Sequence, residues 1–249
     1  MENALPMPRV IDLTHPLGWL AAGWRDLWRQ PSASLFYGAA VALTGVMILF
    51  ISFSLPWLFV PSASGFLLVA PMLATGLYSL SRAYERGETL GLRASMVAWL
   101  PSALGFIGIS LLVLIAGTIW QLFSLVMLAM LYHGPAMTPL DLIHEIIVDP
   151  EYTGLFFLYV GVGGLAAAMV FALTVISMPL LLDRGGHALD AMLVSFNVVA
   201  SNPVPLALWA VLIMLFTGIG FATGMLGFVI ILPWLGHASW HAYRDLVQD

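Results

Sequence analysis

The sequence predicts an all-α integral membrane protein with six transmembrane helices, arranged as three hairpins that each follow an interfacial amphipathic helix. Apolar residues make up 61% of the 249 residues and charged residues only 8%, against roughly 25% charged residues in soluble domains. So little charge cannot cover a globule in water, which predicts a single polytopic membrane domain over residues 1–249. A second observation is a recurring order of amphipathic segment, proline, apolar run, turn and apolar run.

Charge and cysteine content exclude several classes of function. The net charge is −5, from 13 acidic and eight basic residues, and every basic residue is an arginine. No basic stripe could neutralise nucleic-acid phosphates, so no nucleic-acid partner is expected. The chain has no cysteine, which excludes disulfides and cysteine-ligated metal centres.

The first amphipathic segment is expected over residues 16–30. Its apolar side chains recur at helical spacing, which predicts one apolar face made of Leu17, Leu20, Trp24, Leu27 and Trp28. The polar face is predicted to hold Arg25, Asp26 and Arg29. Tryptophans on one face and arginines on the other suit the membrane–water interface, and the alternative is a helix packed on a soluble domain. Similar segments are predicted at 89–100 and 187–202.

Six apolar runs are long enough, or nearly so, to cross a ~30 Å hydrocarbon core. They are predicted near residues 35–55, 64–82, 102–131, 155–182, 205–222 and 225–243. The run over 102–131 would be ~45 Å long as one helix and must tilt, bend or project from the membrane. Residues 205–243 carry no charge and would be almost twice too long as one helix, so a reversal is predicted among the glycines between Gly218 and Gly227.

The segments also indicate a threefold internal repeat. Each amphipathic segment leads through a proline into a span, and each return helix contains a proline and ends at an arginine. The entry prolines are Pro31, Pro101 and Pro203, and the return pairs are Pro71 with Arg82, Pro179 with Arg184, and Pro233 with Arg244. The alternative is that helical hairpins in lipid converge on this pattern.

The arginines predict the topology. With six spans, all eight arginines fall on the side that also holds both termini. Because arginine and lysine are enriched in cytoplasmic loops, both termini of this multi-pass protein are predicted to be cytoplasmic.

The polar residues give few candidate sites. No charged residue lies in the interior of a predicted span, which disfavours an ion-coupled carrier. Gln121 is the most polar deep side chain and is interpreted as an interhelical hydrogen-bond partner rather than a substrate ligand. On the far-side loop, Asp141, Glu145 and Asp149 lie four residues apart and predict a solvated acidic helix face, with a cation site as the alternative.

His237 and His241 are the one histidine pair at i, i+4 spacing on a predicted helix. Such a pair could bind a cofactor, as a haem or metal ligand set. The competing interpretation is an interfacial anchor formed with Trp234, Trp240 and Tyr243. Two histidines without a third ligand are a weak metal signal, so no metal site and no resident cofactor are predicted. No catalytic residues are predicted either, because no enzyme motif is present.

The C-terminal block LPWLGHASWHAYRDLV, over 232–247, resembles the ending of a bacterial integral-membrane family of unknown function. The segment MPLLLDR over 178–184 and the Asn202-Pro203 pair are also similar. Some members of that family are labelled cytochrome c oxidase subunits. The resemblance implies a six-span, multi-pass protein of the bacterial inner (plasma) membrane with no activity to carry over. The histidine positions do not suit a catalytic haem–copper subunit, which needs several histidines deep in its helices.

The sequence therefore predicts a non-enzymatic membrane protein that acts by association, as an accessory or assembly factor of a respiratory complex. The expected partners are the lipid bilayer and another membrane protein, and a homo-oligomer stays open. One alternative is an uncoupled small-molecule or lipid transporter or channel, with a pore lined by groups such as Gln121, Thr118 and Ser124. The other alternative is a haem- or metal-binding protein that uses His237 and His241.

Overall fold

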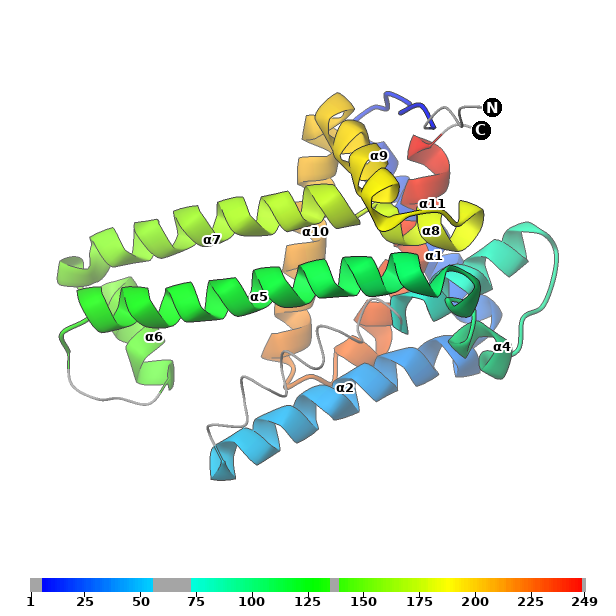
Figure 1. Ribbon diagram of the computed structural model, residues 1–249. Helices are drawn as coiled ribbons and strands as arrows, with labels where there is room; N and C mark the ends of the chain where they lie inside the picture. Colours follow the sequence, from blue (N-terminus) through cyan, green and yellow to red (C-terminus); the bar gives the residue numbers. More distant parts are fainter. Residues whose placement is uncertain (1–5, 56–72, 135–138, 248–249) are drawn as a thin grey trace.

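A computed structural model describes residues 6–55, 73–134 and 139–247, and this part of the chain is all-helical (Figure 1). The named helices are α1 (His15–Arg29), α2 (Pro31–Ser54), α4 (Leu92–Met96), α5 (Ala103–Leu131), α6 (Pro139–Val148), α7 (Thr153–Thr174), α8 (Ser177–Arg184), α9 (Ala188–Ser201), α10 (Pro203–Ala222) and α11 (Phe228–Leu246). A further helix is described over 73–85. The predicted fold class, all-α, is confirmed at this level.

Four helical stretches are long and apolar enough to cross a membrane: Pro31–Ile51, Leu92–Leu131, Pro150–Arg184 and Pro203–Ala222. They coincide with four of the six predicted spans. The predicted span at 64–82 lies partly outside the described residues. The predicted span at 225–243 corresponds to α11, whose second half carries His241 and Arg244 among its apolar residues. The six-span arrangement with three hairpins stays a prediction.

Prolines and glycines explain where these helices begin and end. Pro31 and Pro203 each occupy the first helical position of α2 and α10, where a missing N–H costs nothing. Between α10 and α11 the chain reverses through Gly224 and Met225, which have φ of 61° and 72°. This reversal lies inside the stretch that the sequence predicts for it.

The predicted run over 155–182 is not one continuous helix. Instead α7 ends at Thr174 and α8 begins at Ser177. Pro179 has no N–H to donate to the carbonyl of Val175, and its ring crowds that carbonyl, so the helix breaks there. The backbone N–H of Ile176 is held by Ser195 Oγ of α9, at 3.2 Å. The break turns α8 back onto the hydrophobic core.

Helix α11 is the central element of the bundle, packed along both α1 and α2. A Cβ added at Gly23 of α1 would lie 2.5 Å from the backbone nitrogen of Ala238. A Cβ at Gly38 of α2 would lie 2.2 Å from the carbonyl oxygen of Val229. That carbonyl has no α-helical partner, because Pro233 stands four residues later. Glycine thus allows the two flanking backbones to reach α11.

The structure corrects the predicted faces of α1 at Leu20, Asp26 and Leu27, which are all buried, and leaves Trp24 and Trp28 exposed as an interfacial face requires. Trp24 and Trp28 are 41% and 49% exposed, whereas Asp26, expected on the polar face, is only 4% exposed. The buried face consists of Pro16, Trp19, Leu20, Gly23, Asp26 and Leu27. The periodicity of α1 contains two apolar stripes, and the inner stripe, which includes Asp26, packs on α11.

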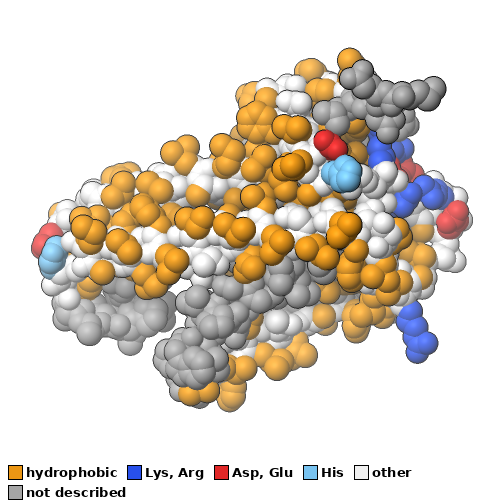
Figure 2. All heavy atoms as spheres, in the orientation of Figure 1, with side chains coloured by type: hydrophobic (Ala, Val, Ile, Leu, Met, Phe, Trp, Pro, Cys, Tyr) orange, Lys and Arg blue, Asp and Glu red, His pale blue; other side chains and the backbone are white. Residues whose placement is uncertain are grey.

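Two long helices, α5 and α7, lie side by side and extend away from this bundle (Figure 1). Arginines gather at the opposite end, where Figure 2 shows the basic side chains. Several of them pair with acids there, including Arg82 with Asp183 and Arg244 with Glu85. The described structure therefore separates a polar, cross-linked end from an apolar pair of projecting helices.

Candidate functional site

Four helices converge on a buried polar network at the arginine-rich end. Its members are Asp26 of α1, Ser34 of α2, Ser81 of the 73–85 helix, and His237 and His241 of α11. Of these, only His241 reaches the surface, with 29% of its side chain exposed. His237 and Ser34 have no exposed surface. The two histidines predicted as a pair are thus joined through groups that the sequence did not single out.

His237 uses both of its ring nitrogens. Nε2 lies 2.9 Å from Ser34 Oγ, and Nδ1 lies 2.7 Å from Ser81 Oγ. The ring of Tyr84 lies over it, with the centroids 6.4 Å apart. A buried imidazole whose two nitrogens are both hydrogen-bonded is satisfied in place.

Asp26 is the acceptor on which the network ends. Its Oδ2 accepts from Ser81 Oγ at 2.8 Å and from His241 Nε2 at 2.7 Å, and Arg29 lies 3.8 Å from Oδ1. Burial on its own would raise the pKa of Asp26, but the hydrogen bonds from His241 and Ser81, with the nearby histidine rings, bring it below its ordinary value. The carboxylate is therefore ionised at neutral pH.

The proton positions follow from this carboxylate. An ionised Asp26 can only accept, so Ser81 gives it its single hydroxyl proton and must itself accept from His237 Nδ1–H. Neutral His237 then has an unprotonated Nε2, which accepts from the hydroxyl of Ser34. The hydrogen bonds run in one direction, from Ser34 through His237 and Ser81 to Asp26.

This direction predicts the tautomer of His237. With ¹⁵N-histidine labelling, NMR at neutral pH should show a neutral ring protonated on Nδ1, the less common form of free histidine. A His237→Gln variant assigns the resonance. A ring protonated on Nε2 would contradict the proposed order of donors and acceptors.

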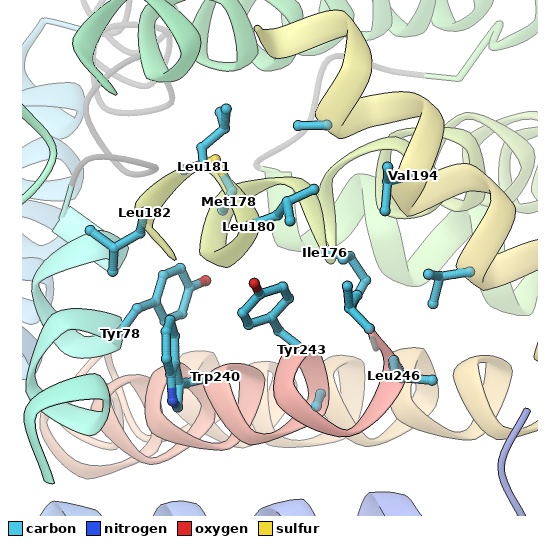
Figure 3. Packing of buried hydrophobic residues seen from close by; sticks show 14 of the residues in the cluster. Tyr78, Ile176, Met178, Leu180, Leu181, Leu182, Val194, Trp240, Tyr243 and Leu246 are labelled. Carbon is cyan, nitrogen blue, oxygen red and sulfur yellow. The ribbon is translucent and has the colours of Figure 1, made fainter. Parts of the chain in front are cut away.

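A second polar cluster lies beside the first one, around Asp183 at the end of α8. Its carboxylate pairs with Arg82 at 3.0 Å and accepts from Tyr243 Oη at 2.9 Å. Tyr243 and Trp240 point from α11 toward α8, next to Tyr78 (Figure 3). The hydrophobic core thus lies directly against the ion pairs, which fixes α8 to α11.

The network does not resemble a metal centre. No group of three or more metal-ligating side chains occurs in the described residues. Both nitrogens of His237 are already hydrogen-bonded to serines, and Nε2 of His241 to Asp26. The donor set therefore fits a polar cross-link better than a haem or metal ligand pair, and the cofactor role of His237 and His241 stays a prediction.

The other polar candidates are not brought together. Glu145 accepts from Tyr132 Oη at 2.6 Å, and Asp149 caps the backbone N–H of Glu151; the side chain of Asp141 lies outside the described residues. Gln121 Oε1 is buried with no hydrogen-bond partner in the described part of the chain. Its expected interhelical bond is therefore not seen for this atom.

A groove of about 430 Å³ lies between α5 and α7, away from the polar network. Small residues line it, including Ala116 and Gly117 of α5 and Gly163, Gly164 and Ala167 of α7. Trp120 and Tyr159, with ring centroids 4.9 Å apart, also belong to its lining. The lining is almost entirely apolar, which suits an apolar occupant and not a charged substrate.

Residues 58–183 match the family model described as "Predicted integral membrane protein (DUF2189)". The chain belongs to this family. It is accordingly an integral, multi-pass membrane protein, as the composition predicts. No curated protein and no solved structure is significantly similar to the chain.

The residues that match DUF2189 include one of the two candidate sites and exclude most of the other. The whole α5–α7 groove lies within it, whereas Asp26, Ser34, His237 and His241 lie outside it. The C-terminal motif that carries the sequence resemblance also lies outside. The family comparison therefore concerns the membrane character and the groove region, and it does not test the oxidase label.

Sequence reasoning found two members of the network and missed three. The missed residues are Asp26, Ser34 and Ser81. A signal for Asp26 was present, because the stripe of Trp19, Leu20, Gly23 and Leu27 passes through its position. For the two serines no signal exists, since nothing in their local sequence distinguishes them from the other serines of the chain.

Proposed function

We propose that this protein is a non-catalytic membrane protein that binds a transmembrane helix of another membrane protein in the groove between α5 and α7. The observation that carries the proposal is the small-residue lining of that groove on two projecting apolar helices. In lipid, small residues let a further helix backbone approach closely, and van der Waals packing then drives the association. Many apolar side chains elsewhere on α5 and α7 are exposed, as lipid-facing positions are.

The enclosure of the polar network supports a non-catalytic role. A substrate would have to reach Ser34 or His237, and both are completely buried. The hydroxyl of Ser34 is hydrogen-bonded to an imidazole, as an activated nucleophile would be. That resemblance does not extend to the rest of the network. Ser81, Asp26 and His241 are hydrogen-bonded to one another or to His237, so the network links four helices as a structural cross-link does.

The partner that we propose is a subunit of a respiratory complex, for which this protein serves as an accessory or assembly factor. The support is the oxidase label attached to proteins that the C-terminal motif resembles. The distribution of the arginines supports cytoplasmic termini, and the bacterial family that the C-terminal motif resembles supports an inner-membrane location.

A groove-filling substitution tests the proposal. Neither Gly164 nor Gly161 of α7 has an atom within 4 Å of an added Cβ, but only Gly164 lines the groove. Gly164→Leu should fill the groove and remove the partner, whereas Gly161→Leu should retain it. The measurement is quantitative mass spectrometry of proteins that co-purify in mild detergent, with thermal unfolding as the check on folding.

The expected result is at least a tenfold loss of the partner with Gly164→Leu alone. If both variants keep the same co-purifying proteins, helix binding in the groove is wrong. If a partner is lost selectively but is no respiratory subunit, the groove proposal stands and the respiratory assignment fails.

A further inference from the structure

Helix α1 carries a second apolar stripe that the described protein covers only in part. Leu17, Trp24 and Trp28 are 57%, 41% and 49% exposed, although the opposite face of α1 is buried against α11. Trp24 packs edge-on against Trp28 and Trp234, with centroids 5.6 Å and 5.1 Å apart. The indoles are thus held in place on the protein and still present apolar surface outward.

The segment that contains α4 also exposes large apolar side chains. Met96, Val97 and Leu100 are 44%, 51% and 52% exposed. The segment is fixed to the bundle by a 2.8 Å hydrogen bond between Ser95 Oγ and Tyr37 Oη of α2. Figure 1 shows α1 and α4 at the same end of the molecule.

The arginines at this end fall into two groups. Arg9, Arg82 and Arg244 form ion pairs with Asp245, Asp183 and Glu85. In contrast, Arg25, Arg86 and Arg93 are exposed and pair with no acidic side chain in the described residues.

The unpaired arginines flank the exposed apolar side chains. Arg25 follows Trp24 directly on α1, and Arg93 lies three residues before Met96 on α4. Arg86 is two residues from Tyr84, whose ring lies 5.5 Å from the guanidinium carbon of Arg29 at the end of α1. The two helices and the turn between the 73–85 helix and α4 therefore carry exposed apolar side chains and exposed arginines at the same end of the molecule.

We propose that this surface, made of Trp24, Arg25, Trp28, Arg86, Arg93 and Val97, binds the headgroup layer of an anionic phospholipid bilayer. Charge complementarity selects this occupant, because arginines with no acidic partner in the described residues lie beside indoles that prefer the boundary between water and hydrocarbon. An arginine near such a surface contributes about 1 kcal/mol through attraction to anionic lipid. Trp24 and Trp28 set the depth at which α1 lies, and the arginines select the lipid charge.

The test counts lipids on the purified full-length protein. Native mass spectrometry measures the binding of phosphatidylglycerol and of phosphatidylcholine to wild type, Arg25→Gln, Arg93→Gln and Arg9→Gln. The last variant is the matched control, since it removes the same charge from an arginine that is already paired with Asp245. Thermal unfolding checks that each variant is folded.

The expected result is a preference of wild type for phosphatidylglycerol that weakens about fivefold in Arg25→Gln and in Arg93→Gln, and little in Arg9→Gln. Equal binding of the two lipids by wild type would overturn the proposal. An equal loss of phosphatidylglycerol preference in all three variants would also overturn the proposal, because the net charge of the protein and not this surface would then determine lipid binding. Loss of an acidic protein partner with unchanged lipid binding would assign the surface to protein instead. These residues are not part of the α5–α7 groove, so the result is independent of the proposed function.

Discussion

Replacing Asp26 by alanine is expected to lower the free energy of unfolding by about 3 kcal/mol. Asp26 accepts hydrogen bonds from Ser81 and His241 in a site that is 4% exposed. Without the carboxylate, the buried hydroxyl of Ser81 and the half-buried ring of His241 lose their acceptor, and a desolvated donor without a partner is costly. Thermal unfolding of the purified protein in detergent measures the change.

The control is Asp190→Ala, an exposed acid in the first turn of α9, which should change the stability by well under 1 kcal/mol. The pH supplies a second check. Because the pKa of Asp26 lies below its ordinary value of 3.8, its contribution is present above pH 3.8 and is lost as the pH falls through its folded-state pKa. Equal unfolding temperatures for Asp26→Ala and wild type at neutral pH would show that the network stabilises nothing.

Gly23→Ala is expected to destabilise the protein by about 2 kcal/mol, although it adds only one methyl group to a helix. The new Cβ would lie 2.5 Å from the backbone nitrogen of Ala238 and 2.8 Å from its Cα, so α1 and α11 must move apart. Movement there also strains the bonds that Asp26 makes to His241, since these residues follow one helical turn later on each helix.

Gly18→Ala on the same helix is the matched control. No atom lies within 4 Å of an added Cβ at Gly18. Alanine also favours the helix over glycine by about 0.5–1 kcal/mol, so this variant should be as stable as wild type or slightly more stable. Chemical or thermal unfolding of both variants gives the comparison, and similar losses at both positions would contradict close packing of α1 on α11.

Local sequence signals predicted the helices well. Pro31 and Pro203 begin α2 and α10, and Gly224 provides the positive φ of the reversal before α11. Such residues act on their own backbone, so their effect can be read without knowing the fold. The break between α7 and α8 is harder to predict, because Pro179 alone does not show whether the helix kinks or ends there.

The candidate site was predictable only in part, for a physical reason. His237 and His241 are neighbours on one helix, so their spacing reveals them. Asp26 meets Ser81 and His241 across 55 and 215 residues of sequence. Only packing decides which residues of α1 face α11, and the spacing alone assigns Asp26 to the polar face and Leu20 and Leu27 to the interfacial face, although all three are buried.

The pairing of the two chain ends limits how the chain can cross a bilayer. Pro8 forms an antiparallel bridge with Val247, and the N–H of Arg9 donates to the carbonyl of Leu246 at 2.9 Å. The N–H of Ile11 donates to Asn202 Oδ1, just before α10. Residues 8, 202 and 247 therefore lie on the same side, and the number of crossings between each two of them must be even. A chain that crosses through α10 must come back before Val247, and this requirement agrees with the predicted span at 225–243.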